Sequence, residues 1–241
     1  MIIKEHIVAS FDEELGELSQ RIAEMGGIAE QQLADSVRAL ARRDGELAQS
    51  VIAIDRRMDQ LQREIEDKAT LMIAKRQPMA QDLRQIVGAM HIANDLERVG
   101  DLAKNTAKRV FAIEGNFGAQ RLVAGVEHIA ELSFAQLKNV LDAYTARDLA
   151  AAHAVWEKDD EIDAMYTSLF RELLTYMMED PRNITFCIHL LFCAKNLERI
   201  GDHATNIAET IHYVITGVPQ TDERPKKDTT SSMPVEFVPK E

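Results

Sequence analysis

The sequence predicts an all-α fold built by internal duplication, with six long helices arranged as two three-helix bundles. Only 5% of the 241 residues are aromatic, while Ala, Leu, Glu and Arg, which favour helices, are common. Residues 96–101 read Leu-Glu-Arg-Val-Gly-Asp, and residues 197–202 repeat this stretch with a single Val-to-Ile change. Alanine and asparagine positions around the two stretches also match, so the repeat covers about half the chain.

The first predicted helix begins at a capping box formed by Ser10 and Glu13. Apolar side chains then recur at three- and four-residue steps as far as Leu40, which is the spacing of one buried helix face. The pair Gly26-Gly27 interrupts this pattern and allows either a kink or close packing.

Two further helices complete the first half. Asp44 is the expected N-cap of the second helix, which reaches about residue 73. Pro78 is suited to the start of the third helix, which we expect to end near Gly115.

The second half repeats this plan. The fourth helix is predicted over residues 119–145, and Asp148 caps the fifth, just as Asp44 caps the second. Asp180 and Pro181 read as the cap and first turn of the sixth helix, which stops by Gly217. Because the connections are short, sequential helices are expected to be antiparallel neighbours.

The predicted organisation is therefore residues 1–117 as the first bundle and residues 118–217 as the second. Residues 218–241 contain four prolines among polar side chains and predict a disordered tail.

Composition excludes several classes of protein. The net charge of −12 argues against nucleic acid as a partner. The two cysteines, Cys187 and Cys193, lie in one apolar segment and do not form the pattern of a disulfide-stabilised protein. This favours a reducing, cytoplasmic location. The first 15 residues lack the apolar core of a signal peptide, and the longest apolar run, residues 184–194, is too short to span a bilayer.

Acidic residues occupy mirror positions about the turn of each predicted hairpin. Acids four residues apart share a helix face, about 6 Å apart along the axis. Asp59 with Glu97, and Asp55 with Asp101, are equidistant from Pro78. In an antiparallel hairpin such residues stand at the same height, so two rungs of carboxylates should face each other.

The second half has the same arrangement. Asp163 with Glu198, and Asp159 with Asp202, are equidistant from the Asp180-Pro181 junction. An ordinary charged surface is the alternative, since a chain with 40 acids contains some such pairs by chance.

Four carboxylates at one level repel each other unless a cation neutralises them. The ligands are oxygen atoms only, with Asn105 and Asn206 extending the two sets, which suits Mg²⁺, Mn²⁺, Ca²⁺ or an iron ion. On a helical wheel Glu97 and Asp101 lie opposite the apolar stripe, so we expect the acids on the outer surface. Arg98 and Arg199 are expected to point away from the carboxylates beside them.

Motifs typical of enzymes are not recognised, and we expect no catalytic activity. The alternative is a carboxylate-bridged iron-handling or oxidase bundle, since Glu209 and His212 have the Glu-x-x-His spacing. The repeat does not preserve that pair. His203 is expected to be a surface residue. A third hypothesis is that the protein is a helical scaffold that binds no metal.

The duplicated Leu-Glu-Arg-[Val/Ile]-Gly-Asp stretches, the paired acids and the segment Lys75-Arg76-Gln77-Pro78 closely resemble the PhoU family. The segment over residues 173–180 does so too, and the resemblance covers about residues 5–217. It implies two three-helix bundles with multinuclear metal sites, which map to the acids at positions 55, 59, 97 and 101 and at positions 159, 163, 198 and 202.

The resemblance also implies a role and partners. Family members act as negative regulators of the phosphate-starvation response and link the ATPase subunit of the phosphate ABC transporter to a membrane sensor histidine kinase. They are typically cytosolic, reach the membrane only through partners and often form homodimers.

Overall fold

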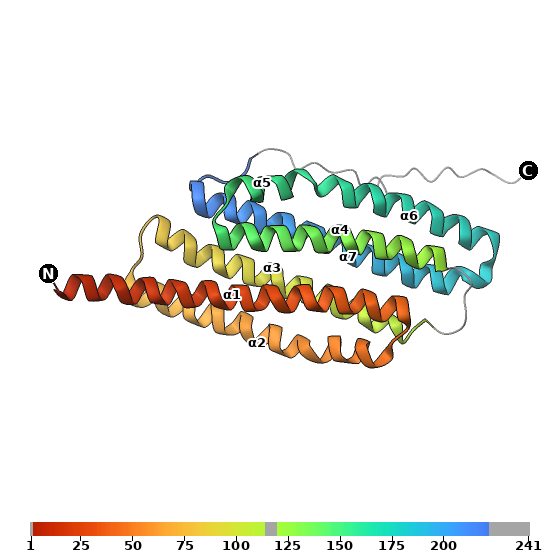
Figure 1. The fold of residues 1–241 in the computed structure, drawn as a ribbon, viewed down its shortest axis with the longest axis horizontal. Helices are drawn as coiled ribbons and strands as arrows, with labels where there is room; N and C mark the ends of the chain where they lie inside the picture. Colours follow the sequence, from red (N-terminus) through yellow and green to blue (C-terminus); the bar gives the residue numbers. More distant parts are fainter. Residues whose placement is uncertain (1, 114–119, 222–241) are drawn as a thin grey trace, which may run out of the picture.

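The computed structural model describes residues 2–113 and 120–221, which form an elongated molecule whose helices run along its long axis (Figure 1). Within these ranges the chain is helical and contains no strand. The elements are α1 (Ile2–Arg42), α2 (Gly45–Arg76), α3 (Gln81–Val110), α4 (Gln120–Ala146), α5 (Leu149–Glu157), α6 (Asp159–Glu179), the 3-10 turn η1 (Pro181–Asn183) and α7 (Ile184–Thr216).

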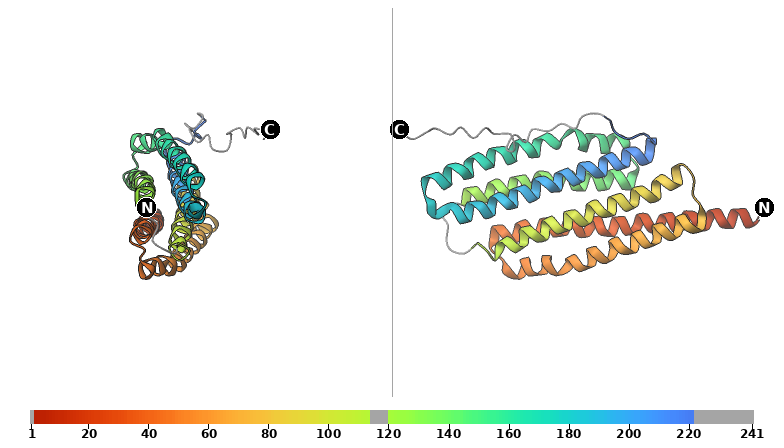
Figure 2. Two further views of the ribbon diagram at one scale, coloured as in Figure 1. Left: turned by 90° about the vertical axis from the view of Figure 1, so that its right-hand side faces the viewer. Right: turned by 180° about the vertical axis from the view of Figure 1, so that it is seen from behind.

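The helices form two bundles that pack side by side, with α1–α3 in one and α4–α7 in the other (Figures 1 and 2). Between the bundles, α3 packs along α7 and α1 packs against α4, whereas α2 and the α5–α6 pair lie on the outside. The all-α fold with two duplicated three-helix bundles is thus confirmed. The predicted boundary at residues 117 and 118, and the tail beyond residue 221, lie outside the described residues.

Equivalent caps start the second helix of each repeat. The Asp44 side chain accepts a hydrogen bond from the Leu47 backbone N–H at 2.9 Å, and Asp148 accepts one from Ala151 at 3.0 Å. Both predicted caps are confirmed. The preceding residue has a positive φ in both repeats, 57° at Arg43 and 51° at Arg147, which ends the helix before it.

The predicted start of the first helix is wrong. The helix extends to Ile2, and Ser10 lies inside it, where its hydroxyl accepts a hydrogen bond from the Arg76 guanidinium at 2.9 Å. Arg76 also binds Glu14 at 2.9 Å, so this pair ties α1 to the end of α2. The Ser10 hydroxyl therefore takes part in a contact between α1 and α2 and does not cap a helix.

The start and end of the third helix also differ from the prediction. Pro78 lies in the connection and α3 begins three residues later, at Gln81, while its last residue is Val110, not Gly115. Asp180 is the predicted cap, but it caps the short turn η1 through the Arg182 N–H at 3.0 Å before α7 begins.

The predicted fifth helix is broken at Lys158, which separates α5 from α6. Gln136 on α4 donates its side-chain N–H to the Lys158 carbonyl at 2.9 Å, which satisfies an acceptor near the break. In the first repeat α2 runs through without a break, and the equivalent Gln32 donates to the Val51 carbonyl at 3.4 Å.

Gly26-Gly27 causes close packing and does not interrupt α1. A Cβ on Gly26 would lie 2.9 Å from both δ-methyls of Leu141 on α4, whereas one on Gly27 would have nothing within 4 Å. The missing side chain at Gly26 therefore lets the two bundles approach at the α1–α4 crossing.

The core contains the apolar side of both repeated motifs. Leu96, Val99, Leu197 and Ile200 are completely buried. Cys187 and Cys193 are free and buried, and burial raises the pKa of Cys193 to about 12. None of the described helices combines the length and apolar character needed to cross a bilayer.

Candidate functional site

In the first repeat, Asp55 and Asp101 stand at the same level and contact one ammonium group. The Lys104 Nζ atom lies 2.6 Å from Asp55 Oδ2 on α2 and 2.5 Å from Asp101 Oδ1 on α3. This rung of the predicted hairpin is therefore formed, and an amino-acid side chain supplies the positive charge between its carboxylates.

The pKa of the Glu97 carboxyl group is raised above its ordinary value. Burial is the largest cause, and the carboxylates of Asp101, Asp59 and Asp55 raise the pKa further. The Arg98 guanidinium opposes the shift, since it lies 3.5 Å from Glu97 and 3.6 Å from Asp101. The expectation that Arg98 points away was wrong, because its long side chain reaches both the adjacent Glu97 and Asp101, three residues further along α3.

In the second repeat, a hydroxyl and a lysine contact the acids. Thr205 donates to Asp159 Oδ1 at 3.0 Å, and Lys195 donates to Glu198 Oε1 at 2.8 Å. The other oxygen of Glu198 is buried without a hydrogen-bond partner. Burial raises the pKa of Glu198, and the carboxylates of Asp202 and Asp163 raise it further against the effect of Lys195.

The two carboxylate sets differ at one equivalent position. Lys104 follows Asp101 by three residues, and Thr205 follows Asp202 by three residues. Asp55 and Asp159, which these two side chains contact, are equivalent as well. The repeat thus places an ammonium group in the first set where the second has a neutral hydroxyl.

The expected surface location holds only partly. Asn105 is exposed and Glu97 and Asp101 are half-buried, but the second set is mostly covered: the exposed fractions are 4% for Asp159, 5% for Asp163 and 6% for Glu198. A helical wheel gives the direction away from one helix's own core, and the packing of α6 on α7 covers that direction.

Two polar residues of α7 face the other bundle. Asn206 donates to Asp95 Oδ1 on α3 at 3.4 Å, and His203 Nδ1 lies 2.9 Å from the same oxygen. The His203 side chain is 16% exposed, so its prediction as a surface residue was wrong. Its position in the sequence cannot reveal that α3 lies against it.

The Glu-x-x-His pair of the alternative hypothesis is engaged elsewhere. Glu209 accepts a hydrogen bond from the Trp156 indole N–H at 3.1 Å, and His212 Nδ1 lies 3.1 Å from the Val218 carbonyl oxygen. These contacts hold α7 to α5 and to the segment after α7.

Across residues 2–113 and 120–221, no group of three or more His, Cys, Asp or Glu side chains has the geometry to hold a metal ion. The donor chemistry of the second set nevertheless fits a hard cation, since its acids offer oxygen ligands and Glu198 has a buried oxygen without a partner. The sequence reasoning missed Lys104, Lys195 and Thr205. Aligning the two repeats would have revealed the Lys104–Thr205 difference.

Comparison with known proteins agrees with the duplicated fold. The family model described as "PhoU domain" matches twice, over residues 22–110 and 126–211. The chain is 63% identical to the phosphate-specific transport system accessory protein PhoU homolog of Rhizobium meliloti, over 95% of this chain and 96% of that one. It is 55% identical to the protein of the same description from Caulobacter vibrioides, over 94% and 99% of the two chains.

Two solved structures have the same fold. The crystal structure of PhoU from Pseudomonas aeruginosa matches with a TM-score of 0.81 and 38% identity, over 86% of this chain and all of that one. The phosphate transport system regulatory protein PhoU from Streptococcus pneumoniae matches with a TM-score of 0.81 and 30% identity, over 87% and 99%. The protein belongs to the PhoU family.

Proposed function

We propose that this protein is a non-enzymatic accessory regulator of phosphate-specific transport and a negative regulator of the phosphate-starvation response. The observation that carries the proposal is a 63% identity along 95% of the chain to a phosphate-specific transport system accessory protein. The duplicated acidic motif lies inside both matched family domains, so the similarity includes the candidate sites.

The proposed mechanism is that of an adaptor in the cytoplasm. The protein, as a homodimer, holds a sensor histidine kinase and the ATPase subunit of the phosphate ABC transporter in the repressing arrangement when phosphate is plentiful. An adaptor of this kind acts by binding one state of its partners more tightly than the other. It reaches the membrane through these partners and binds no nucleic acid.

Divalent or trivalent cations (Mg, Mn, Ca or Fe ions) are proposed to bind the acidic residues of each repeat. The first site comprises Asp55, Asp59, Glu97, Asp101 and Asn105, and the second comprises Asp159, Asp163, Glu198, Asp202 and Asn206. A bound cation supplies positive charge that neutralises the carboxylates. The ammonium groups of Lys104 in the first set and of Lys195 in the second already contact these carboxylates, so a cation competes with a lysine at each site.

A gene deletion tests the regulatory role. We expect the deletion strain to express its phosphate-scavenging genes in high phosphate, and a plasmid copy of the intact gene to restore repression. Transcript levels of those genes measure the effect. Repression that persists in the deletion strain contradicts the proposal.

A pull-down tests the adaptor mechanism. The full chain, immobilised, is mixed with the transporter ATPase subunit and the cytoplasmic part of the sensor kinase, with and without a chelator. We expect both partners to be retained. Retention of neither partner contradicts the adaptor mechanism, and retention unchanged by the chelator contradicts a role of the cation in it.

A further inference from the structure

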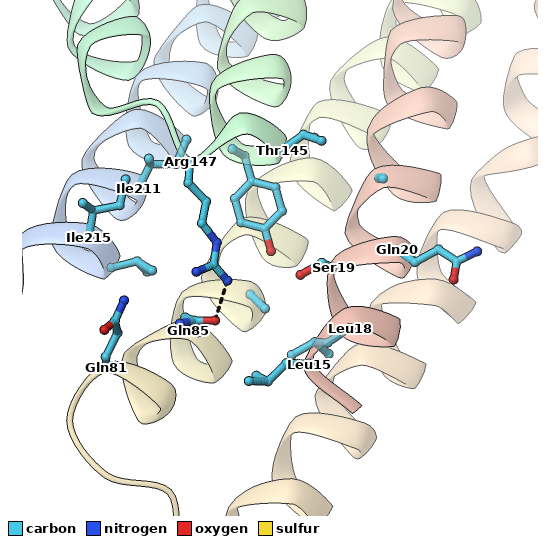
Figure 3. Close-up of a pocket in the computed structure, with 14 residues that line it drawn as sticks. Leu15, Leu18, Ser19, Gln20, Gln81, Gln85, Thr145, Arg147, Ile211 and Ile215 are labelled. Carbon is cyan, nitrogen blue, oxygen red and sulfur yellow. Dashed lines mark hydrogen bonds between the residues drawn. The ribbon is translucent and has the colours of Figure 1, made fainter. Parts of the chain in front are cut away.

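A cavity of about 350 Å³ lies between the two bundles, away from the carboxylate sets. Its walls come from α1 and α3 of one bundle and from α4 and α7 of the other (Figure 3). Leu15 and Leu18 form an apolar wall on one side, and Ile211 and Ile215 form one on the other. Interfaces between domains are common places for small-molecule sites, and this volume is at the lower end of their range.

One cationic side chain lines the solvent-exposed edge of this cavity. Arg147, which follows the last residue of α4, extends toward α3, and its Nη2 atom donates to the Gln85 side-chain oxygen at 2.8 Å (Figure 3). Among the described residues, the salt bridges do not include Arg147. Arg147 is exposed, so its guanidinium lies at the solvent-facing edge of the cavity and has the neutral Gln85 amide as a hydrogen-bond partner.

Further hydrogen-bonding groups line the cavity. Tyr144 on α4 and Ser19 on α1 each contribute a hydroxyl group, and Gln81 and Gln85 belong to the first turns of α3. The α3 N-cap residue, Ala80, makes no side-chain cap, and Asp82 supplies an acidic side chain in the first turn of this helix. The cavity thus combines apolar walls with a positively charged, polar end.

The opposite end of the α1–α4 seam is different. There a more open groove of about 560 Å³ is lined by α1 and α4 alone, and Arg38 and Arg42 face Glu127 and Glu131 across it. Arg43, the repeat equivalent of Arg147, does not line that groove. Arg42 in that groove also lies outside the salt bridges of the described residues, so the first cavity differs in its walls, which come from four helices, and in the hydrogen bond between Arg147 and Gln85.

We propose that this cavity binds one small amphiphilic anion, an unbranched acyl chain with a carboxylate or phosphate-monoester head group. The head group binds the Arg147 guanidinium and replaces Gln85 as its partner, and the chain packs between Leu15, Leu18 and Ile211. A charge-assisted hydrogen bond of this kind is stronger than the bond to an amide. A ligand in this position touches both bundles and so stabilises their present arrangement.

Calorimetric titration of the full chain tests this inference with four probes: decanoate, decyl phosphate, decanol and inorganic phosphate, each below any micelle-forming concentration. We expect decanoate or decyl phosphate to bind with one site per chain and to raise the melting temperature. The stronger of the two identifies the head group. Decanol and inorganic phosphate should each bind at least ten-fold more weakly, because each lacks one half of the ligand.

Two pairs of variants locate the site. Arg147→Gln should weaken binding of the anionic probe about ten-fold or more, while Arg43→Gln, at the equivalent turn outside the cavity, should leave it unchanged. Ala23→Leu, which fills the cavity from α1, should abolish binding, and Ala34→Leu, which lines the opposite groove, should not. Circular dichroism confirms that each variant is folded.

Several results would overturn the inference. These are no binding of either anionic probe, a stoichiometry well above one, equal affinities for the Arg147→Gln and Arg43→Gln variants, or decanoate binding that survives Ala23→Leu. If either leucine variant is unfolded, the arginine pair decides the question alone.

Discussion

Glu198 is a buried carboxyl group whose surroundings make the stability of the second repeat depend on pH. One of its oxygens binds Lys195, and the other is buried without a partner. Burial and the nearby carboxylates of Asp202 and Asp163 raise its pKa above the ordinary value of 4.5. The native state therefore holds this proton more tightly than the unfolded state does, and the contribution of Glu198 to stability falls as pH rises from about 4.5 through the raised value.

Replacing this carboxyl group should flatten the pH profile of the metal-free protein. In Glu198→Gln the side chain no longer titrates, so we expect the free energy of unfolding to decline less with rising pH than in the parent chain. Urea denaturation from pH 4.5 to pH 8 in the presence of a chelator measures this. Glu179→Gln, an exposed position at the end of α6, is the control. Parallel profiles for Glu198→Gln and the parent would contradict the assignment.

Helix packing depends on particular glycines, and two of them give opposite predictions. Gly27 and Gly88 both lie inside long helices, but a Cβ on Gly27 meets nothing within 4 Å, whereas one on Gly88 would collide with Val214 on α7. Gly27→Ala should therefore stabilise the protein by about 0.5–1 kcal/mol through helix propensity. Gly88→Ala should destabilise it by about 1–3 kcal/mol, because α3 and α7 must separate slightly.

Urea denaturation of these two variants checks the prediction. If Gly88→Ala is as stable as Gly27→Ala, then α3 and α7 do not pack as closely in solution as the structure has them.

Helix starts that depend on local interactions can be predicted from the sequence, whereas those that depend on contacts between helices cannot. The caps at Asp44 and Asp148 are side-chain bonds to a backbone N–H three residues ahead, so a short stretch of sequence suffices to predict them. The break at Lys158 is accompanied by a hydrogen bond from Gln136 on another helix, which a local stretch of sequence does not show. The false start at Ser10 has a similar cause, since its partner Arg76 lies at the end of α2.

Over the whole molecule, polar contacts tie the two bundles together along α3 and α7. Asp95 binds His203 at 2.9 Å, and its repeat equivalent, Asn196, donates to Thr106 at 3.3 Å. The Asp95 carboxylate is 8% exposed, so removing its partner leaves a buried acceptor poorly satisfied.

A double-mutant cycle measures this contact between the bundles. Asp95→Asn and His203→Gln should each destabilise the protein, and their effects should be non-additive by about 1 kcal/mol or more, as expected for residues in direct contact. Unfolding free energies of the two single variants and the double variant provide the test. Additive effects would mean that the two side chains do not interact in solution.

The sequence predicted which acids of the candidate site lie level along the helix axes, but it did not predict the positive charges beside them or their burial. Equal distances from the turn place Asp55 level with Asp101, because an antiparallel hairpin of regular helices fixes the register. Sequence separations from the turn do not reveal which side chains from other positions reach the same level. Lys104 in the first set, and the cover over Asp159 in the second, follow from side-chain reach and from packing between helices.

We propose that the carboxylate sets hold cations and that the Lys104 ammonium competes with a cation at the first set. Exchange of the equivalent residues Lys104 and Thr205 tests this proposal, with Mn²⁺ titrated calorimetrically into chelator-treated protein. We predict that Thr205→Lys weakens Mn²⁺ binding about ten-fold or more, because an ammonium then sits beside Asp159, and that Lys104→Thr strengthens binding at the first set. Mn²⁺ binding that is absent from the parent chain, or identical in all three proteins, would contradict the account.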